Sequence, residues 1–141
     1  MFVQLLVGTA VSLINIAIHA VCTAFLYYAV LVFWARRTDR HFLTDRVVLM
    51  VGTVAVLMTA HALEVFVWTI IYELVGAVPD GASPAYLAFV NYTTLGYGDV
   101  LHVKAWQMLG PLTAMNGILL FGWSTAAIIQ VGRTTVPDTP P

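Results

Sequence analysis

Three long apolar stretches divide the chain, and each is long enough to cross a membrane as a helix. They cover residues 1–34, which carry no charge, residues 47–75 and residues 103–131. Because about 20 apolar residues span the hydrocarbon core of a bilayer, we predict three transmembrane helices. At ~1.5 Å per residue the first would be ~50 Å long. It must therefore tilt, lie partly along the membrane interface, or break near Gly8 or Asn15.

A shorter apolar segment, residues 84–94, lies between the second and third stretches. Ser83 is a preferred N-cap residue, and Pro84 is suited to the first turn of a helix. A helix of about eleven residues reaches only ~16 Å, so it would enter the membrane, stop near the middle and return as extended backbone. The pattern therefore predicts an all-α membrane protein with three transmembrane helices, a re-entrant half-helix and an extended segment after it.

The composition agrees with this fold class. Of the 141 residues, 60% are hydrophobic and only 9% are charged, whereas a soluble domain is about 25% charged. The net charge of −1 says nothing about nucleic acid, but the sequence has no basic patch, so we expect no nucleic-acid partner. We therefore expect an integral, multi-pass protein of a plasma or inner membrane, surrounded by lipid.

Basic residues are concentrated between the first two stretches. Four of the six lie here: Arg36, Arg37, Arg40 and Arg46. Because cytoplasmic loops carry an excess of lysine and arginine, we expect this loop to lie in the cytoplasm. The amino terminus then lies outside, and the third stretch delivers Arg133 and the carboxyl terminus to the cytoplasm.

The most informative motif is residues 94–98 (Thr-Leu-Gly-Tyr-Gly), followed by Asp99. Stacked rings of backbone carbonyl groups can replace the hydration shell of a potassium ion. To aim successive carbonyl groups at one axis, the backbone must alternate in hand, and glycine adopts the left-handed conformations without a side-chain penalty. Gly96 and Gly98 supply that alternation, so we predict an ion-binding segment.

This motif resembles the potassium-channel signature, Thr-Val-Gly-Tyr-Gly, and the resemblance extends over residues 46–133. It implies a pore domain at 46–133 that consists of a helix, a pore helix at 84–94, a filter at 94–98 and an inner helix. Residues 1–45 are then an additional N-terminal helix with the basic loop, and residues 134–141 are a short cytoplasmic tail. Because one filter strand cannot encircle an ion, the resemblance also implies a homotetramer with a tetrameric pore.

The resemblance assigns roles to individual residues. It places K⁺ at the carbonyl groups of four filter residues, with Gly98 completing the selectivity filter: Thr94, Leu95, Gly96 and Tyr97. It places support for the filter at four further positions: Thr93, Asp99, Tyr86 and Val90. The implied function is passive, potassium-selective conduction, with K⁺ as the permeant ion, no cofactor and no enzymatic activity.

The chain departs from this family at several positions around the filter. Many members carry tryptophans at the positions of Tyr86 and Leu87, and one of these bonds the aspartate behind the filter. We expect the Tyr86 hydroxyl to bond Asp99 instead. Val90 replaces a carboxylate of some members, and Leu95 replaces the usual valine. These changes leave a weakly selective cation channel as an alternative.

Glycines in the third stretch bear on how such a pore opens. By resemblance, the inner helix bends at a mid-helix glycine, and Gly117 fits that position best. Phe121 and Ile129 would then form a hydrophobic constriction that gates by dewetting. Close packing against a neighbouring helix explains a membrane glycine equally well, so both interpretations of Gly117 stay open.

Two ionisable residues lie deep inside the second stretch, away from its ends. His61 and Glu64 are one turn apart and therefore share a helix face, and such groups face protein or a water-filled cavity. Three interpretations compete: hydrogen bonding between helices, a pH-sensing pair, and a metal site to which His19 contributes. A non-conducting partner subunit, or a small intramembrane enzyme built on these residues, are further alternatives to a channel. His102, at the outer end of the third stretch, is expected to be solvated.

Overall fold

The computed structural model describes residues 1–36 and 42–134. Helix α1 spans Phe2–Arg36, α2 spans Phe42–Leu74, α3 spans Pro84–Tyr92 and α4 spans Leu109–Thr134, with a short 3-10 turn, η1, at Lys104–Trp106. The described residues contain no strand. Arg37 and Arg40 of the predicted basic loop, and residues 135–141 of the predicted tail, lie outside the described ranges.

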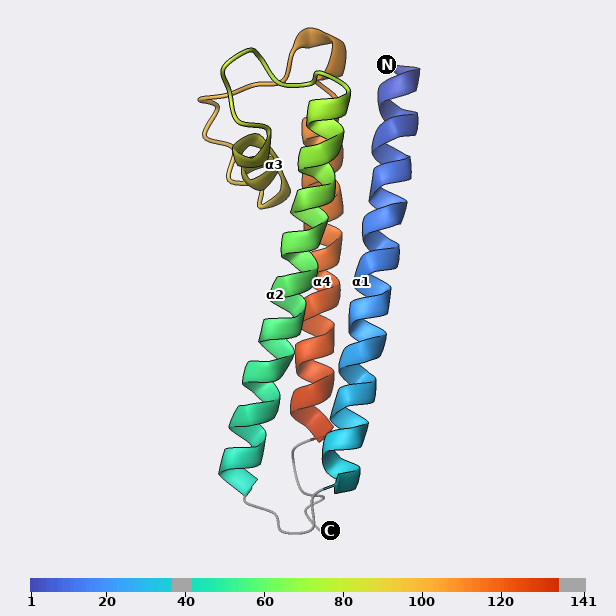
Figure 1. Ribbon diagram of the computed structural model, residues 1–141, viewed down its shortest axis with the longest axis vertical. Helices are drawn as coiled ribbons and strands as arrows, with labels where there is room; N and C mark the ends of the chain where they lie inside the picture. Colours follow the sequence, from blue (N-terminus) through green and yellow to red (C-terminus); the bar gives the residue numbers. More distant parts are fainter. Residues whose placement is uncertain (37–41, 135–141) are drawn as a thin grey trace.

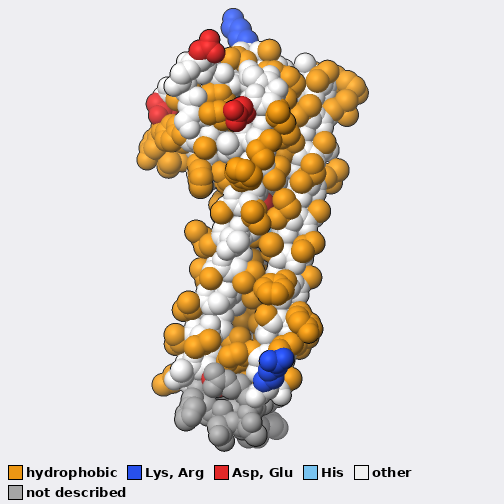
Figure 2. Space-filling view, viewed as in Figure 1, with side chains coloured by type: hydrophobic (Ala, Val, Ile, Leu, Met, Phe, Trp, Pro, Cys, Tyr) orange, Lys and Arg blue, Asp and Glu red, His pale blue; other side chains and the backbone are white. Residues whose placement is uncertain are grey.

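Three of the helices, α1, α2 and α4, are long and apolar enough to cross a membrane. They lie side by side, with the amino terminus at the end that carries α3 and its loops (Figure 1). Hydrophobic side chains follow the length of the visible face, and the charged ones gather near its two ends (Figure 2). The prediction of an all-helical, multi-pass membrane protein is confirmed.

Helix α1 is continuous, so of the three alternatives left open by the sequence, a break at Gly8 or Asn15 does not occur. Both residues are buried contacts between helices. A Cβ added to Gly8 would lie 2.4 Å from the Leu112 Cδ1 atom of α4. The Asn15 side-chain amide donates to the Glu64 carbonyl oxygen of α2 at 3.3 Å and to Asn116 Oδ1 of α4 at 3.0 Å. These residues hold α1 against its neighbours, and they do not bend it.

Several predicted helix boundaries move by a few residues. Helix α3 ends at Tyr92, two residues before its predicted end, because Thr93 is its C-cap. Helix α4 begins at Leu109, six residues later than predicted. Pro111 therefore lies in the first turn, where a backbone N–H would have no acceptor within the helix, so proline is tolerated there. Just before α4, the Met108 N–H donates to the side chain of Gln4 at 2.9 Å.

The short helix α3 is fixed by its cap and by the helices that it packs against. The Ser83 hydroxyl accepts from the Tyr86 N–H at 3.3 Å, and Pro84 lies in the first turn, so the predicted cap is confirmed. Helix α3 contacts α2 and α4, while α1 contacts the same two helices. The aromatic side chains of Trp68, Tyr72 and Tyr92 fill the core where α3 meets α2. This packing places the end of α3 against the middle of the bundle.

Candidate functional site

The segment after α3 alternates in backbone hand. Its φ angle is +59° at Thr94, +58° at Gly96 and +75° at Gly98, so every second residue is left-handed. The prediction that the two glycines supply this alternation is confirmed. Thr94 was not expected to be left-handed, because β-branched residues avoid that region. Because Thr94 lies two residues before Gly96, extending the alternating pattern backwards would have predicted its left-handed conformation.

The first residues of this segment are held by the end of α3. The Thr94 N–H donates to the Asn91 carbonyl oxygen at 3.0 Å, and the Leu95 N–H donates to the Val90 carbonyl oxygen at 2.9 Å. The carboxyl end of a helix carries a partial negative charge. The segment therefore begins where the helix dipole favours a cation.

Residues 93–99 are all exposed in the single chain. The side chains of Leu95 and Tyr97 are 53% and 68% exposed. In a membrane, non-helical backbone is tolerated only where it is buried in protein or lines water. One chain thus supplies neither a cover for this segment nor a closed ring of carbonyl groups.

Two of the predicted supporting residues are joined by a hydrogen bond. The Tyr86 hydroxyl donates to Asp99 Oδ2 at 2.7 Å, as the sequence led us to expect. This bond raises the pKa of the Tyr86 hydroxyl above its ordinary value. The other two supporting residues belong to α3 and its cap: Val90 is buried, and the Thr93 hydroxyl bonds the Phe89 carbonyl oxygen at 2.7 Å.

Replacing Tyr86 with phenylalanine tests this bond. The change removes only the hydroxyl that holds Asp99. By the resemblance to potassium channels, we expect the chain to fold normally while its ion flux decays several-fold faster with time. The measurement is flux from liposomes followed over minutes. Tyr28→Phe, on the exposed face of α1, is the control and should behave as wild type. Equal decay in both variants would show that the Tyr86–Asp99 bond does not support the segment.

Gly117 is a packing glycine. A Cβ added to it would lie 2.0 Å from the carbonyl oxygen of Tyr92 in α3, and Gly117 itself is buried. Of its two interpretations, close packing is the one that the structure shows. A hinge at Gly117 and a hydrophobic constriction at Phe121 and Ile129 stay predictions. The side chains of Phe121 and Ile129 are 37% and 51% exposed in the single chain.

A buried polar cluster joins the four main helices. We use this name for His19 of α1, His61 and Glu64 of α2, Tyr92 of α3 and Ser124 of α4. Glu64 Oε1 lies 2.8 Å from His19 Nδ1, and Glu64 Oε2 lies 2.9 Å from His61 Nδ1. The Tyr92 hydroxyl also donates to Glu64 Oε2. The interpretation of His61 and Glu64 as hydrogen-bonding residues between helices is confirmed.

Sequence reasoning missed Tyr92 and Ser124 as members of this cluster. Their only signal was a hydroxyl within an apolar helix, and that pattern does not say which face of the helix is buried. Ser124 Oγ lies 2.9 Å from His61 Nε2 and 3.4 Å from His19 Nε2. It therefore joins the far sides of both imidazole rings.

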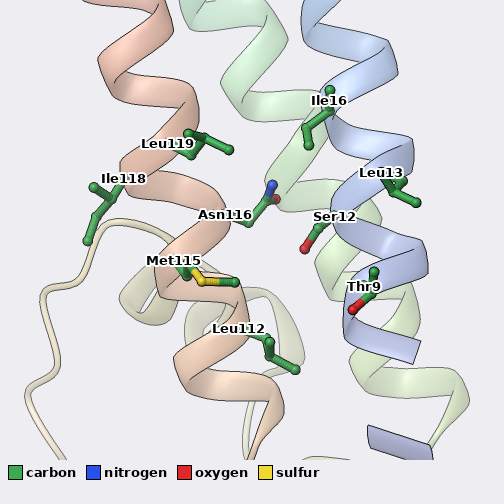
Figure 3. Close-up of a pocket in the computed structure, with 9 residues that line it drawn as sticks. All are labelled: Thr9, Ser12, Leu13, Ile16, Leu112, Met115, Asn116, Ile118 and Leu119. Atoms are coloured by element: carbon green, nitrogen blue, oxygen red, sulfur yellow. The ribbon is translucent and has the colours of Figure 1, made fainter. Parts of the chain in front are cut away.

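A second group of polar contacts links the same helices. Asn116 Oδ1 accepts from Asn15 Nδ2 at 3.0 Å and from Trp68 Nε1 at 3.1 Å. Asn116 also borders a groove between α1 and α4, and Figure 3 shows its side chain between residues of the two helices. The groove is otherwise mostly apolar, with these lining residues: Thr9, Ser12, Leu13, Ile16, Leu112, Met115, Ile118 and Leu119. Its polar lining thus comes from α1 and Asn116.

His102 was expected to be solvated, but the structure packs its ring against other side chains. Its ring lies edge-on to the Tyr72 ring, with 4.5 Å between centroids, and its Cε1 and Nδ1 atoms lie 3.4 Å from the position of a Cβ on Gly110. Among the described residues, no group bonds its buried Nε2 atom. This burial lowers the pKa of His102 to about 4. The ring is therefore neutral near pH 7, and an effect of external pH through His102 is not expected there.

The lowered pKa of His102 predicts a loss of stability in acid. Between its ordinary pKa near 6.5 and about 4, the unfolded chain binds a proton at His102 that the folded chain does not. Stability at this site therefore falls as pH decreases through that interval. We expect His102→Gln to reduce the decline in melting temperature between pH 6.5 and 4. The same decline in both proteins would contradict this assignment.

Comparison with known proteins adds one finding. A family model described as "Ion channel" matches residues 47–134, which include most of α2, all of α3, the left-handed segment and α4. Neither the curated proteins nor the solved structures contain a match. The matched region begins after α1, so this helix is an addition to the part that the family model describes.

Proposed function

The chain belongs to this ion-channel family, of the two-helix pore-domain type, and we propose that it conducts potassium passively through a pore that four copies share. The observation that carries the proposal is the left-handed backbone at Thr94, Gly96 and Gly98. Carbonyl groups from such an alternating strand can point toward one axis and replace the water around an ion. Permeation needs no cofactor beyond K⁺ itself.

The number of copies follows from the geometry of a closed ring. Each chain has one strand of this kind, and its residues 93–99 are exposed. Cyclic symmetry about an axis next to the strand would cover it and complete each ring of carbonyl groups. We propose four copies, as in the channels whose filter the motif resembles. Thr94, Leu95, Gly96 and Tyr97 then supply the carbonyl ligands of K⁺.

We propose an orientation from the basic residues. Arg36 ends α1, Arg46 lies near the start of α2, and Arg133 lies at the end of α4. Because the three long helices run alternately up and down (Figure 1), these arginines share one end of the bundle. The positive-inside rule assigns this end to the cytoplasm. The amino terminus and the filter mouth then face the outside of a cell membrane.

Flux from liposomes that contain the purified protein tests the proposal. We expect K⁺ efflux down its gradient, much smaller Na⁺ efflux, and block by Ba²⁺, a divalent ion of similar size to K⁺. Chemical cross-linking should give a species of four chains. Equal K⁺ and Na⁺ flux would support a weakly selective cation channel instead. A tetramer that passes neither ion would support a non-conducting partner subunit.

A further inference from the structure

We propose that the buried polar cluster binds a zinc ion, with His19, His61 and Glu64 as ligands. Each residue offers one ligand atom, and these atoms lie within 4.8 Å of one another. All three residues are buried, and they come from two different helices, α1 and α2. None of them belongs to the filter, so the proposal does not depend on whether the chain conducts potassium.

The donor atoms are those that zinc prefers. Imidazole nitrogen and carboxylate oxygen bind Zn²⁺ at about 2.0–2.2 Å in tetrahedral geometry, whereas Mg²⁺ and Ca²⁺ prefer oxygen alone. In a tetrahedron with such bonds, neighbouring ligand atoms are ~3.4 Å apart. The Glu64 oxygens lie 2.8 Å from His19 Nδ1 and 2.9 Å from His61 Nδ1. Opening each contact by roughly half an ångström thus makes room for the ion.

A fourth ligand position is occupied by Tyr92. Its hydroxyl oxygen lies 2.8 Å from His61 Nδ1 and bonds Glu64 Oε2. Tyr92 is the last residue of α3, so a zinc ion here would join α1, α2 and α3. Four protein ligands around zinc are typical of structural sites, while catalytic sites keep one position open.

One tautomeric arrangement of the cluster leaves its hydrogen bonds incomplete. If both imidazoles are neutral and donate from Nδ1 to Glu64, both Nε2 atoms are acceptors. Both face the Ser124 hydroxyl, at 2.9 Å from His61 and 3.4 Å from His19. A hydroxyl has one hydrogen and can satisfy only one of these nitrogens. One ring nitrogen in a buried site is then left without a hydrogen-bond donor.

A zinc ion removes this mismatch. When the metal binds at Nδ1, the proton of each neutral ring resides on Nε2, and Ser124 Oγ can accept both N–H groups through its two lone pairs. Metal-bound histidines commonly donate their second N–H in this way. Glu64 contributes one negative charge, which offsets half of the charge of Zn²⁺ in a region where charge is costly. The alternative to a zinc ion is one extra proton on the cluster, carried by His19, which would also complete its hydrogen bonds.

Metal binding to the purified protein separates these occupants. The protein in detergent is stripped with a chelator and dialysed against Zn²⁺, and bound zinc is measured by elemental mass spectrometry. We expect about one zinc per chain and a higher melting temperature with zinc than without. Co²⁺, used as a spectroscopic probe, should give the strong visible absorption of a tetrahedral ion. An extra proton as the only occupant gives no bound zinc, and that result would overturn the proposal.

Variants test the assignment of the ligands. His19→Ala and Glu64→Gln should each lower zinc affinity by at least about 100-fold. His102→Ala removes a histidine outside the cluster and should keep wild-type affinity. Ser124→Ala keeps all the ligands and removes only the acceptor of the two N–H groups, so affinity should fall about 10–100-fold. This milder variant keeps the test decisive if His19→Ala does not fold. Unchanged affinity in Ser124→Ala, or in the ligand variants, would overturn the site.

Discussion

Gly96→Ala is expected to abolish potassium flux while the chain still folds. Gly96 has a φ of +58°, and a Cβ there would meet only the Thr94 carbonyl oxygen, at 3.8 Å. Space is therefore available, and the obstacle is the backbone conformation, which costs an L-residue with a side chain about 1–2 kcal/mol. In a ring of four strands this cost recurs in every copy. The strand can relieve it by rotating the carbonyl groups away from the axis, which removes ion ligands.

Gly81→Ala is the matched control for Gly96→Ala. Gly81 lies in the loop between α2 and α3, has a φ of +80° and has no atom within 4 Å of an added Cβ. It imposes similar backbone strain, but no ion binds there in the proposed pore. We expect Gly81→Ala to keep flux within about twofold of wild type, with a melting temperature lowered about as much as in Gly96→Ala. Full flux in Gly96→Ala, or equal loss in both variants, would contradict the assignment of this segment as the filter.

Local chemistry made much of the fold predictable. The three spans follow from runs of apolar residues, and the start of α3 follows from Ser83 and Pro84. The left-handed conformation of Gly96 and Gly98 was predictable because glycines at every second position allow a backbone that alternates in hand. The Tyr86–Asp99 bond was predictable from the resemblance, because the Tyr86 hydroxyl stands where many members carry a tryptophan that bonds the aspartate. In each case the determining residues lie within one short segment of the sequence.

Contacts between distant residues were not predictable in the same way. Helices α1, α2 and α4 are apolar around most of their circumference, so hydrophobic periodicity does not identify the buried face. The sequence could therefore not show that Tyr92 and Ser124 join His19, His61 and Glu64. It could not choose between packing and bending for Gly117, and it placed His102 in solvent because His102 follows a loop. Each of these outcomes depends on which side chains a neighbouring helix brings close.

Contacts at both its hydroxyl and its carbonyl oxygen hold Tyr92, the residue that ends α3. Its hydroxyl bonds Glu64 in the buried polar cluster. Its carbonyl oxygen lies against α4, 2.0 Å from the position of a Cβ on Gly117. The left-handed segment begins two residues later, at Thr94. The position of that segment in the bundle therefore depends on both contacts, and the contact at Gly117 can be tested by adding a single carbon atom.

We expect Gly117→Ala to prevent α3 from packing in this position and to abolish potassium flux. The added Cβ would lie 2.0 Å from the Tyr92 carbonyl oxygen and 3.0 Å from its carbonyl carbon. Both are backbone atoms, so a side-chain rotation cannot relieve the overlap, and α3 or α4 must move. Overpacking of this kind costs about 1–3 kcal/mol or more. A lower melting temperature and loss of the tetramer on cross-linking are the measurements.

Gly122→Ala, five residues further along α4, separates this overlap from the general effect of alanine in a helix. No atom lies within 4 Å of a Cβ added to Gly122, and alanine favours a helix over glycine by about 1 kcal/mol. The control should therefore melt at the wild-type temperature or above it and keep its flux. The two substitutions share the same chemistry and the same helix, so opposite effects on melting temperature can only come from the contact with Tyr92. If Gly117→Ala were as stable and conductive as Gly122→Ala, that contact would not position the conducting segment.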